Sequence, residues 1–104
     1  MVSDYYWRNS LRNKRNLPGI DFNYEDQLIQ LRKFVFADEF IERLIYDQQN
    51  NNLAFRFNNG SFESGDAEFL YQIIRYFKPK NIIEIGSGNS TKIALMATDK
   101  NLKE

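Results

Sequence analysis

Apolar residues recur every three or four positions in the first half of the chain, which is the spacing of one face of a helix. A helix is predicted to begin at Tyr24, because Asn23 is a capping residue type and Asp26 follows it at capping-box spacing. A break in the pattern at residues 37–39 predicts two short helices or one bent helix. Their apolar faces comprise Leu28, Leu31 and Val35 before the break, and Phe40, Ile41, Leu44 and Ile45 after it.

The middle of the chain changes from helical spacing to alternation. Residues 48–52 are all polar and are predicted to form a loop. Residues 53–57 alternate well enough to predict a short strand. Asn58-Asn59-Gly60 follows with residues that tolerate a positive φ, so the strand is expected to end there.

The clearest predicted helix begins at Ser64 and stops before Pro79. Asp66 and Glu68 place negative charge in its first turn, where it interacts favourably with the helix dipole. The apolar positions of this helix follow the i, i+3, i+4, i+7 spacing of a single face. They are Leu70, Ile73, Ile74 and Phe77.

A β-branched apolar run at residues 81–85 predicts a strand of the kind buried on both faces of a parallel sheet. We expect the preceding helix to pack on Ile83 and Ile85, and the strand to end at Gly86. Residues with N-cap preference follow Gly88 and open a second helix. Its apolar residues are Ile93, Ala94, Leu95, Met96 and Ala97, with a polar tail from Thr98 to Glu104.

The composition narrows the classes of function. With 104 residues the chain has room for one small domain. It has no cysteine and no histidine, which excludes disulfides, thiolate nucleophiles, Cys/His metal sites and catalysis by a Ser-His or Cys-His pair. Its 14 basic and 14 acidic residues give a net charge of +0, so no long-range attraction to nucleic acid or anionic lipid is expected.

Residues 1–22 form a basic, aromatic N-terminal arm that contains no signal peptide. No stretch of the chain reaches the roughly 18 apolar residues of a membrane span, so a cytoplasmic protein without membrane contact is expected. Such an arm can stack on bases and neutralise phosphates, but solvated arms of this composition are common, and the neutral charge counts against nucleic-acid binding. Its basic residues are Arg8, Arg12, Lys14 and Arg15.

Residues 84–91 combine an acidic residue with two glycines at the end of the second predicted strand. Their sequence is Glu-Ile-Gly-Ser-Gly-Asn-Ser-Thr. Glycines there let the backbone turn sharply and approach a ligand, and the helix N-terminus beyond them offers unpaired N–H groups. A carboxylate inside an isoleucine-rich strand loses solvation unless it is paired, so a ligand role is expected for Glu84.

Two well-known nucleotide-binding patterns do not fit this loop. Counted from Gly86, a phosphate loop requires Gly-Lys-Ser/Thr where Thr91, Lys92 and Ile93 stand, so only the lysine matches. The dinucleotide fingerprint requires a third glycine at Thr91 and an acidic residue roughly 20 positions later. Neither pattern gives a role to Glu84.

The remaining pattern, acidic-x-Gly-x-Gly-x-small, resembles the first motif of class I S-adenosylmethionine-dependent methyltransferases. Residues 18–21, 64–70 and 78–91 look like one bacterial branch of that family with a Gly-Ser-Gly-x-Ser-Thr loop. The resemblance implies that the loop lies against the amino-acid part of S-adenosylmethionine and that the acidic residue holds its ammonium group. The cofactor-binding residues it indicates are Glu84, Gly86, Ser87, Gly88, Asn89 and Ser90, with Asp66 and Glu68 as weaker candidates for the pocket.

The resemblance implies an α/β fold, with N-terminal helices and the first helix-strand-loop-helix of a truncated Rossmann-like domain. Residues 23–52 would then be a helical extension, and residues 53–104 the start of an incomplete S-adenosylmethionine-binding domain. The segments that would bind ribose and adenine or carry catalytic side chains are not in this sequence, so the methyl acceptor and the catalytic residues stay unassigned and weak cofactor binding is expected.

A second hypothesis from the sequence is a non-catalytic helical interaction or dimerisation module with a vestigial glycine loop. A lone strand exposes both edges and both apolar faces. The chain is therefore expected to be a fragment, a truncated reading frame or a protein that associates with other copies through unpaired strand edges.

Overall fold

The computed structural model describes residues 17–104, and four helices make up most of them. They are α2 (Tyr24–Arg32), α3 (Ala37–Asn50), α4 (Ser64–Phe77) and α5 (Asn89–Lys103). No residue in the range 17–104 belongs to a β-strand. The predicted α/β fold with the start of a Rossmann-like domain is therefore wrong for this part of the chain, which is helical. The basic residues of the predicted arm lie outside the described residues.

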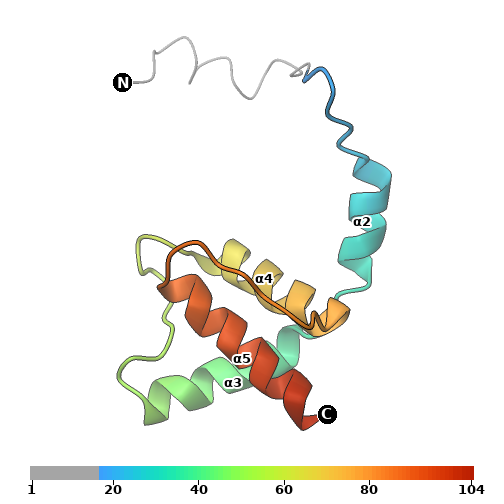
Figure 1. Cartoon of the computed structure of the whole chain (residues 1–104). Coiled ribbons are helices and arrows are strands. Elements are labelled where there is room, and N and C mark those ends of the chain that lie inside the picture. The colour runs from blue at the N-terminus through green and yellow to red at the C-terminus, as the bar shows by residue number, and fades with distance from the viewer. Residues whose placement is uncertain (1–16) are drawn as a thin grey trace, which may run out of the picture.

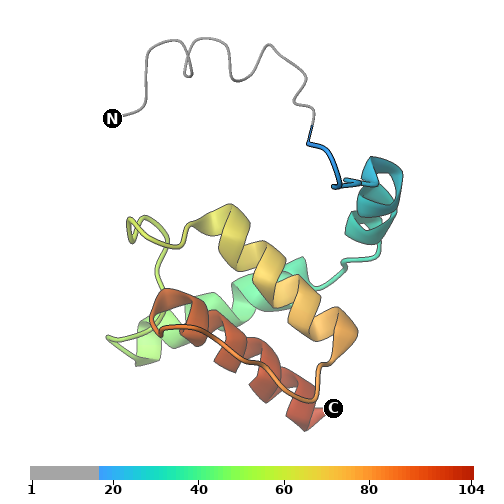
Figure 2. The same ribbon diagram turned by 45° about the horizontal axis from the view of Figure 1, so that its top comes forward.

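Three of the helices pack together, and the fourth stands apart. Helices α4 and α5 lie side by side and point in the same direction, while α3 crosses them (Figures 1 and 2). Helix α2 projects away from this three-helix body in both views. None of the helices within residues 17–104 is long and apolar enough to cross a membrane.

The connection between α4 and α5 runs back along the helices (Figure 1). Because the two helices are parallel, the chain leaves the C-terminal end of α4 and must return to the end where α4 began. A helix of 14 residues such as α4 rises roughly 21 Å, and extended backbone covers about 3.3 Å per residue. Residues 79–88, which could span about 33 Å if fully extended, are therefore long enough to make this return.

Residues 81–85, the predicted second strand, lie in this connection without a neighbouring strand. No backbone hydrogen bond joins them to another backbone group of residues 17–104. Ile83 is 92% exposed and Ile85 103%, so the expectation that they pack on α4 is wrong. A strand exists only through hydrogen bonds to a second strand, and the described residues supply none.

The core forms between α3, α4 and α5. On α4 the buried residues are Ala67, Tyr71, Ile74 and Arg75, whereas Phe77 of the predicted face is exposed. The helix has apolar residues around much of its circumference, and its contacts with α5 and α3 select the buried stripe. The other core residues are Phe40, Leu44, Phe55, Ile93, Met96 and Ala97.

Three predicted boundaries also differ from the structure. Residues 37–39 are the first turn of α3, and the break between helices falls at residues 33–36 instead. Helices α3 and α5 both extend into stretches that composition alone indicates as loop or tail. Residues 53–57 form no strand; Phe55 instead inserts into the core, and its carbonyl accepts a hydrogen bond of 3.1 Å from Gln48 Nε2.

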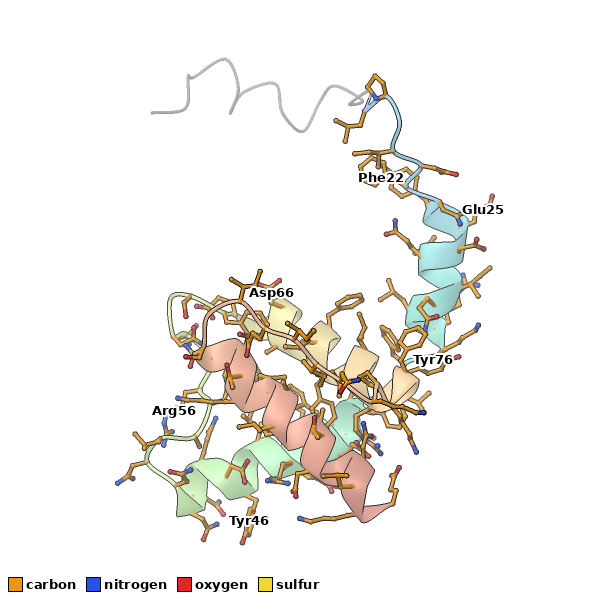
Figure 3. All side chains as sticks on the ribbon, in the orientation of Figure 1. Phe22, Glu25, Tyr46, Arg56, Asp66 and Tyr76 are labelled. Carbon is orange, nitrogen blue, oxygen red and sulfur yellow. The ribbon has the colours of Figure 1, made fainter. Side chains whose placement is uncertain are left out.

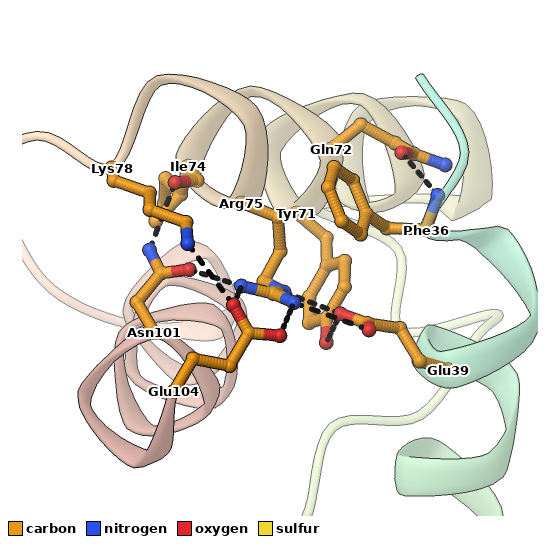
Figure 4. A network of polar contacts seen from close by, with 9 residues as sticks. All are labelled: Phe36, Glu39, Tyr71, Gln72, Ile74, Arg75, Lys78, Asn101 and Glu104. Atoms are coloured by element: carbon orange, nitrogen blue, oxygen red, sulfur yellow. Dashed lines mark hydrogen bonds and ion pairs between the residues drawn. The ribbon is translucent and has the colours of Figure 1, made fainter. Parts of the chain in front are cut away.

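A buried arginine links the three packed helices (Figure 4). Arg75 of α4 is only 1% exposed, and its guanidinium pairs with the carboxylates of Glu39 and Glu104. It also bonds Asn101 and lies 4.6 Å from the centroid of the Phe36 ring. Buried charges are stable only when paired, so this set ties the start of α3 and the end of α5 to α4.

The partners of Arg75 have shifted proton affinities. Burial raises the pKa of Glu39, but hydrogen bonds from Arg75 and Tyr71 outweigh it, so the net pKa is lowered. Hydrogen bonds from Arg75 and Lys78 lower the pKa of Glu104 to about 2. Both carboxylates are thus held in the charged form that the arginine requires.

Candidate functional site

The glycine loop turns directly into α5. Gly86 has φ 88°, a conformation that residues with a Cβ rarely adopt, so a glycine is required there for the chain to turn. Gly88 is the N-cap of α5, and its N–H donates a hydrogen bond of 3.1 Å to Thr91 Oγ1. The backbone N–H groups of the first turn of α5 therefore lie directly beside the loop.

Glu84 is bonded to the first turn of α5. Its carboxylate accepts hydrogen bonds from Ser90 Oγ and, at 2.5 Å, from Thr91 Oγ1. These two bonds lower the pKa of Glu84. The carboxylate lies at the surface, so the desolvation that motivated a ligand role from the sequence is not present in this structure. It is a fixed negative charge beside the loop.

A cavity of about 310 Å³ lies beside the glycine loop. Asn89 Nδ2 donates a hydrogen bond of 3.0 Å to Ser61 Oγ, which joins the loop to the segment before α4. Five of the six residues predicted to contact the cofactor, all except Glu84, line this cavity. The lining residues are Ser61, Phe62, Ile85, Gly86, Ser87, Gly88, Asn89 and Ser90.

Ser61 and Phe62 were not predicted from the sequence. They reach the loop because α4 and α5 are parallel, which places both helix N-termini at the same end of the body (Figure 2). The turn that holds them is well bonded: the Glu63 carboxylate accepts from the N–H groups of Asn58 and Gly60 at 3.0 and 2.8 Å. Only the parallel arrangement of the helices, not any local pattern, indicates their position.

The two weaker candidates for the cofactor pocket, Asp66 and Glu68, lie away from the cavity at the glycine loop. Asp66 is in the first turn of α4 (Figure 3) and does not line the cavity at the glycine loop. Glu68 lines a different cavity of about 300 Å³, together with Phe34 and Phe69 among others. The structure therefore groups neither acid with the glycine loop.

The same connection presents a second feature, an exposed apolar segment. The side chains of Ile83 and Ile85 are almost fully exposed to solvent. Ile82, which precedes them in the connection, is about half exposed. Phe77, at the end of α4, is exposed as well. The three isoleucines therefore expose apolar side chains close together on one short segment.

Comparison with known proteins finds a related sequence. A protein of Archaeoglobus fulgidus described as uncharacterized is 32% identical over 90 residues, which are 86% of this chain and 41% of that protein. The chain thus spans less than half the length of this relative. No protein-family model matches the chain, and no solved structure matches it.

Proposed function

We propose that this chain is a non-catalytic helical interaction module that associates through its exposed isoleucine segment, residues 82–85. The observation that carries the proposal is the exposure of Ile83 and Ile85 on a segment without a backbone partner among residues 17–104. Both apolar side chains and backbone donors and acceptors are available there to another polypeptide.

Covering this segment would contribute apolar burial energy to association. Full burial of one isoleucine side chain contributes roughly 1.5–3 kcal/mol relative to its exposed state. The net charge of +0 means that two copies of the chain do not repel each other at long range. Covering this segment removes an apolar patch from water without disturbing the core, since neither Ile83 nor Ile85 belongs to it.

Sedimentation velocity over a range of concentrations tests the proposal. The parent chain is expected to dimerise, and Ile83→Lys is expected to weaken dimerisation by about tenfold or more, which corresponds to about 1.4 kcal/mol. Leu102→Lys is the matched control, because Leu102 is an exposed apolar residue (81%) near the end of α5 and is not part of the isoleucine segment. A parent that stays monomeric, or equal weakening by both variants, contradicts the proposal.

A second candidate function is supported by the cavity at the glycine loop. We propose that this loop binds the amino-acid part of S-adenosylmethionine in a methyltransferase of which this chain is a part, the acceptor being unassigned. The residues present suit that group: Glu84 offers a fixed carboxylate for an ammonium, and the first turn of α5 offers N–H groups for a carboxylate. Gly86 leaves room for close approach.

The size of the cavity limits what the chain can hold alone. Its volume of about 310 Å³ is at the lower end of the roughly 300–1,000 Å³ typical of small-molecule sites. Contact with only part of the cofactor gives weak binding, with a dissociation constant on the order of millimolar, or about −4 kcal/mol. When bound, the cofactor would supply the electrophilic methyl group, and the residues of this chain would orient it.

Titration of S-adenosylmethionine into the ¹⁵N-labelled chain, followed by NMR, tests the second candidate. Amide shifts are expected at residues 86–90, and Glu84→Gln should raise the dissociation constant about three- to tenfold because the ammonium loses its counter-charge. Glu68→Gln serves as control, since this carboxylate lines the other cavity. A cofactor role is contradicted if no amide shifts appear at millimolar cofactor. It is also contradicted if Glu68→Gln raises the dissociation constant as much as Glu84→Gln does.

A further inference from the structure

Helix α2 is a second apolar element that is left largely uncovered by the other residues of the range 17–104. None of its nine residues is buried, and Leu28 is 55% exposed, with Ile29 and Leu31 about half exposed. An isolated helix shorter than about 12–15 residues is marginal in water, and helices in proteins gain their stability mainly by packing an apolar face. A surface that receives α2 would therefore stabilise it.

The segment after α2 is anchored, whereas the helix meets the body only near its last turn, where Leu31 lines the cavity that Glu68 also lines. The Phe34 ring meets the rings of Phe69 and Tyr76 edge-on at centroid distances of 5.7 and 5.9 Å. The N–H of Phe36 donates a hydrogen bond of 3.0 Å to Gln72 Oε1. In Figure 3, Tyr76 lies at the foot of α2, and Phe22 and Glu25 lie at its far end. The helix thus stands on a fixed base and points away from the body.

We propose that α2 of one copy of this chain covers the isoleucine segment of a second copy, and that the second copy's α2 does the same in return. This inference rests on the proposed association function and names its partner and its contacts. A nine-residue helix rises roughly 13 Å. The stretch from Lys80 to Glu84, which holds Ile82 and Ile83 of the isoleucine segment and a charge at each end, spans about 13–16 Å when extended. The two elements therefore match in length.

Their charges match as well when the two elements run in the same direction. Helix α2 is acidic in its first turn, at Glu25 and Asp26, and basic in its last turn, at Arg32. The isoleucine segment has Lys80 before it and Glu84 near its end. Parallel alignment thus places the acidic end of α2 beside Lys80 and Arg32 beside Glu84, which favours one orientation of the partner.

The helix cannot reach this alignment within its own chain. Phe34, which follows the Arg32 end of the helix, is held against Tyr76, close to where the connection toward Lys80 begins (Figure 3). If α2 folded over its own segment, Arg32 would lie beside Lys80, and the acidic turn would extend toward Glu84. Like charges would then face each other at both ends. A second copy has no such tether and can present α2 in the complementary direction.

When α2 of each copy covers the isoleucine segment of the other, the result is a closed two-fold dimer with two identical contacts. We call this arrangement reciprocal exchange. Each copy contributes α2 to one contact and the isoleucine segment to the other, as a two-fold interface requires. Both unpartnered apolar elements become covered in the same step. The assembly therefore ends at two copies and does not propagate into a filament.

Sedimentation velocity of two variants, alone and mixed, tests the exchange. Leu28→Lys and Ile83→Lys are each expected to weaken dimerisation by about tenfold or more, since each damages both contacts. An equimolar mixture is expected to form a heterodimer that is tighter than either variant alone, because it keeps one undamaged contact, and at the other contact the second lysine adds little to a loss that the first has already caused. One variant carries a fluorescent label to identify the heterodimer.

The outcomes separate this inference from the broader association function. If Ile83→Lys weakens dimerisation while Leu28→Lys does not, the isoleucine segment still mediates association, but α2 is not what covers it. If both variants weaken it and the mixture is no tighter than its components, the reciprocal arrangement is overturned. If the parent chain is monomeric, the association function fails together with the exchange. Leu102→Lys again serves as the control for an added surface charge.

Discussion

Replacing Ile74 by aspartate is expected to abolish the cooperative unfolding transition of this protein. Ile74 is only 3% exposed and belongs to the core between α3, α4 and α5. A carboxylate there loses its hydration without gaining a partner, at a cost of several kcal/mol, which is comparable to the roughly 5–15 kcal/mol that stabilises a whole domain. Thermal unfolding monitored by circular dichroism measures the effect.

The same substitution at Ile83 is the control. Ile83 is 92% exposed, so Ile83→Asp is expected to change the free energy of unfolding of the monomer by no more than about 0.5 kcal/mol. The comparison is made at a protein concentration below the association range. If Ile83→Asp destabilised the monomer as much as Ile74→Asp, the isoleucine segment would be part of the core and not a surface for a partner.

Replacing Arg75 by methionine is expected to lower the free energy of unfolding by about 3–5 kcal/mol, the usual cost of removing one partner from a buried ion pair. Methionine keeps much of the length of the side chain but removes the cation that holds Glu39 and Glu104. Glu39 then loses its ion-pair partner, Glu104 keeps only the exposed Lys78, and Asn101 loses a donor. Denaturation with urea measures the change.

Arg43→Met provides the matched comparison on the surface. Arg43 also pairs with two carboxylates, at 2.8 Å from Asp47 and 2.7 Å from Asp99, but its side chain is 34% exposed. Exposed ion pairs contribute about 0–1 kcal/mol, so a small effect is expected. Equal losses for Arg43→Met and Arg75→Met would mean that the buried network does not hold the three helices together.

The two candidate functions share one short connection. Ile85 lines the cavity at the glycine loop and also belongs to the exposed isoleucine segment. A partner that covers this segment therefore changes one wall of the cavity. If both activities exist, ligand binding and association are thermodynamically linked, and each changes the affinity of the other by the same factor.

The local pattern of the sequence by itself determined several elements of this protein. The start of α2 at Tyr24, the start of α4 at Ser64 and the end of α4 before Pro79 agree with the structure. The requirement for glycine at position 86 is also local, because a tight turn into α5 needs a positive φ. These features depend on residues a few positions apart, so periodicity and the positions of glycine and proline reveal them, although Asn23 forms no side-chain capping bond at the start of α2.

The tertiary structure alone decided the features that depend on a distant partner. The residues around Ile83 have the composition of a buried strand, but a strand requires a second strand, and none lies within residues 17–104. An arginine is usually exposed on the surface of a helix, but the ion pairs of Arg75 with Glu39 and Glu104 make its burial favourable. Ser61 reaches the glycine loop only because α4 and α5 are parallel. Burial and pairing are properties of two segments at once, and the pattern of either segment alone does not contain them.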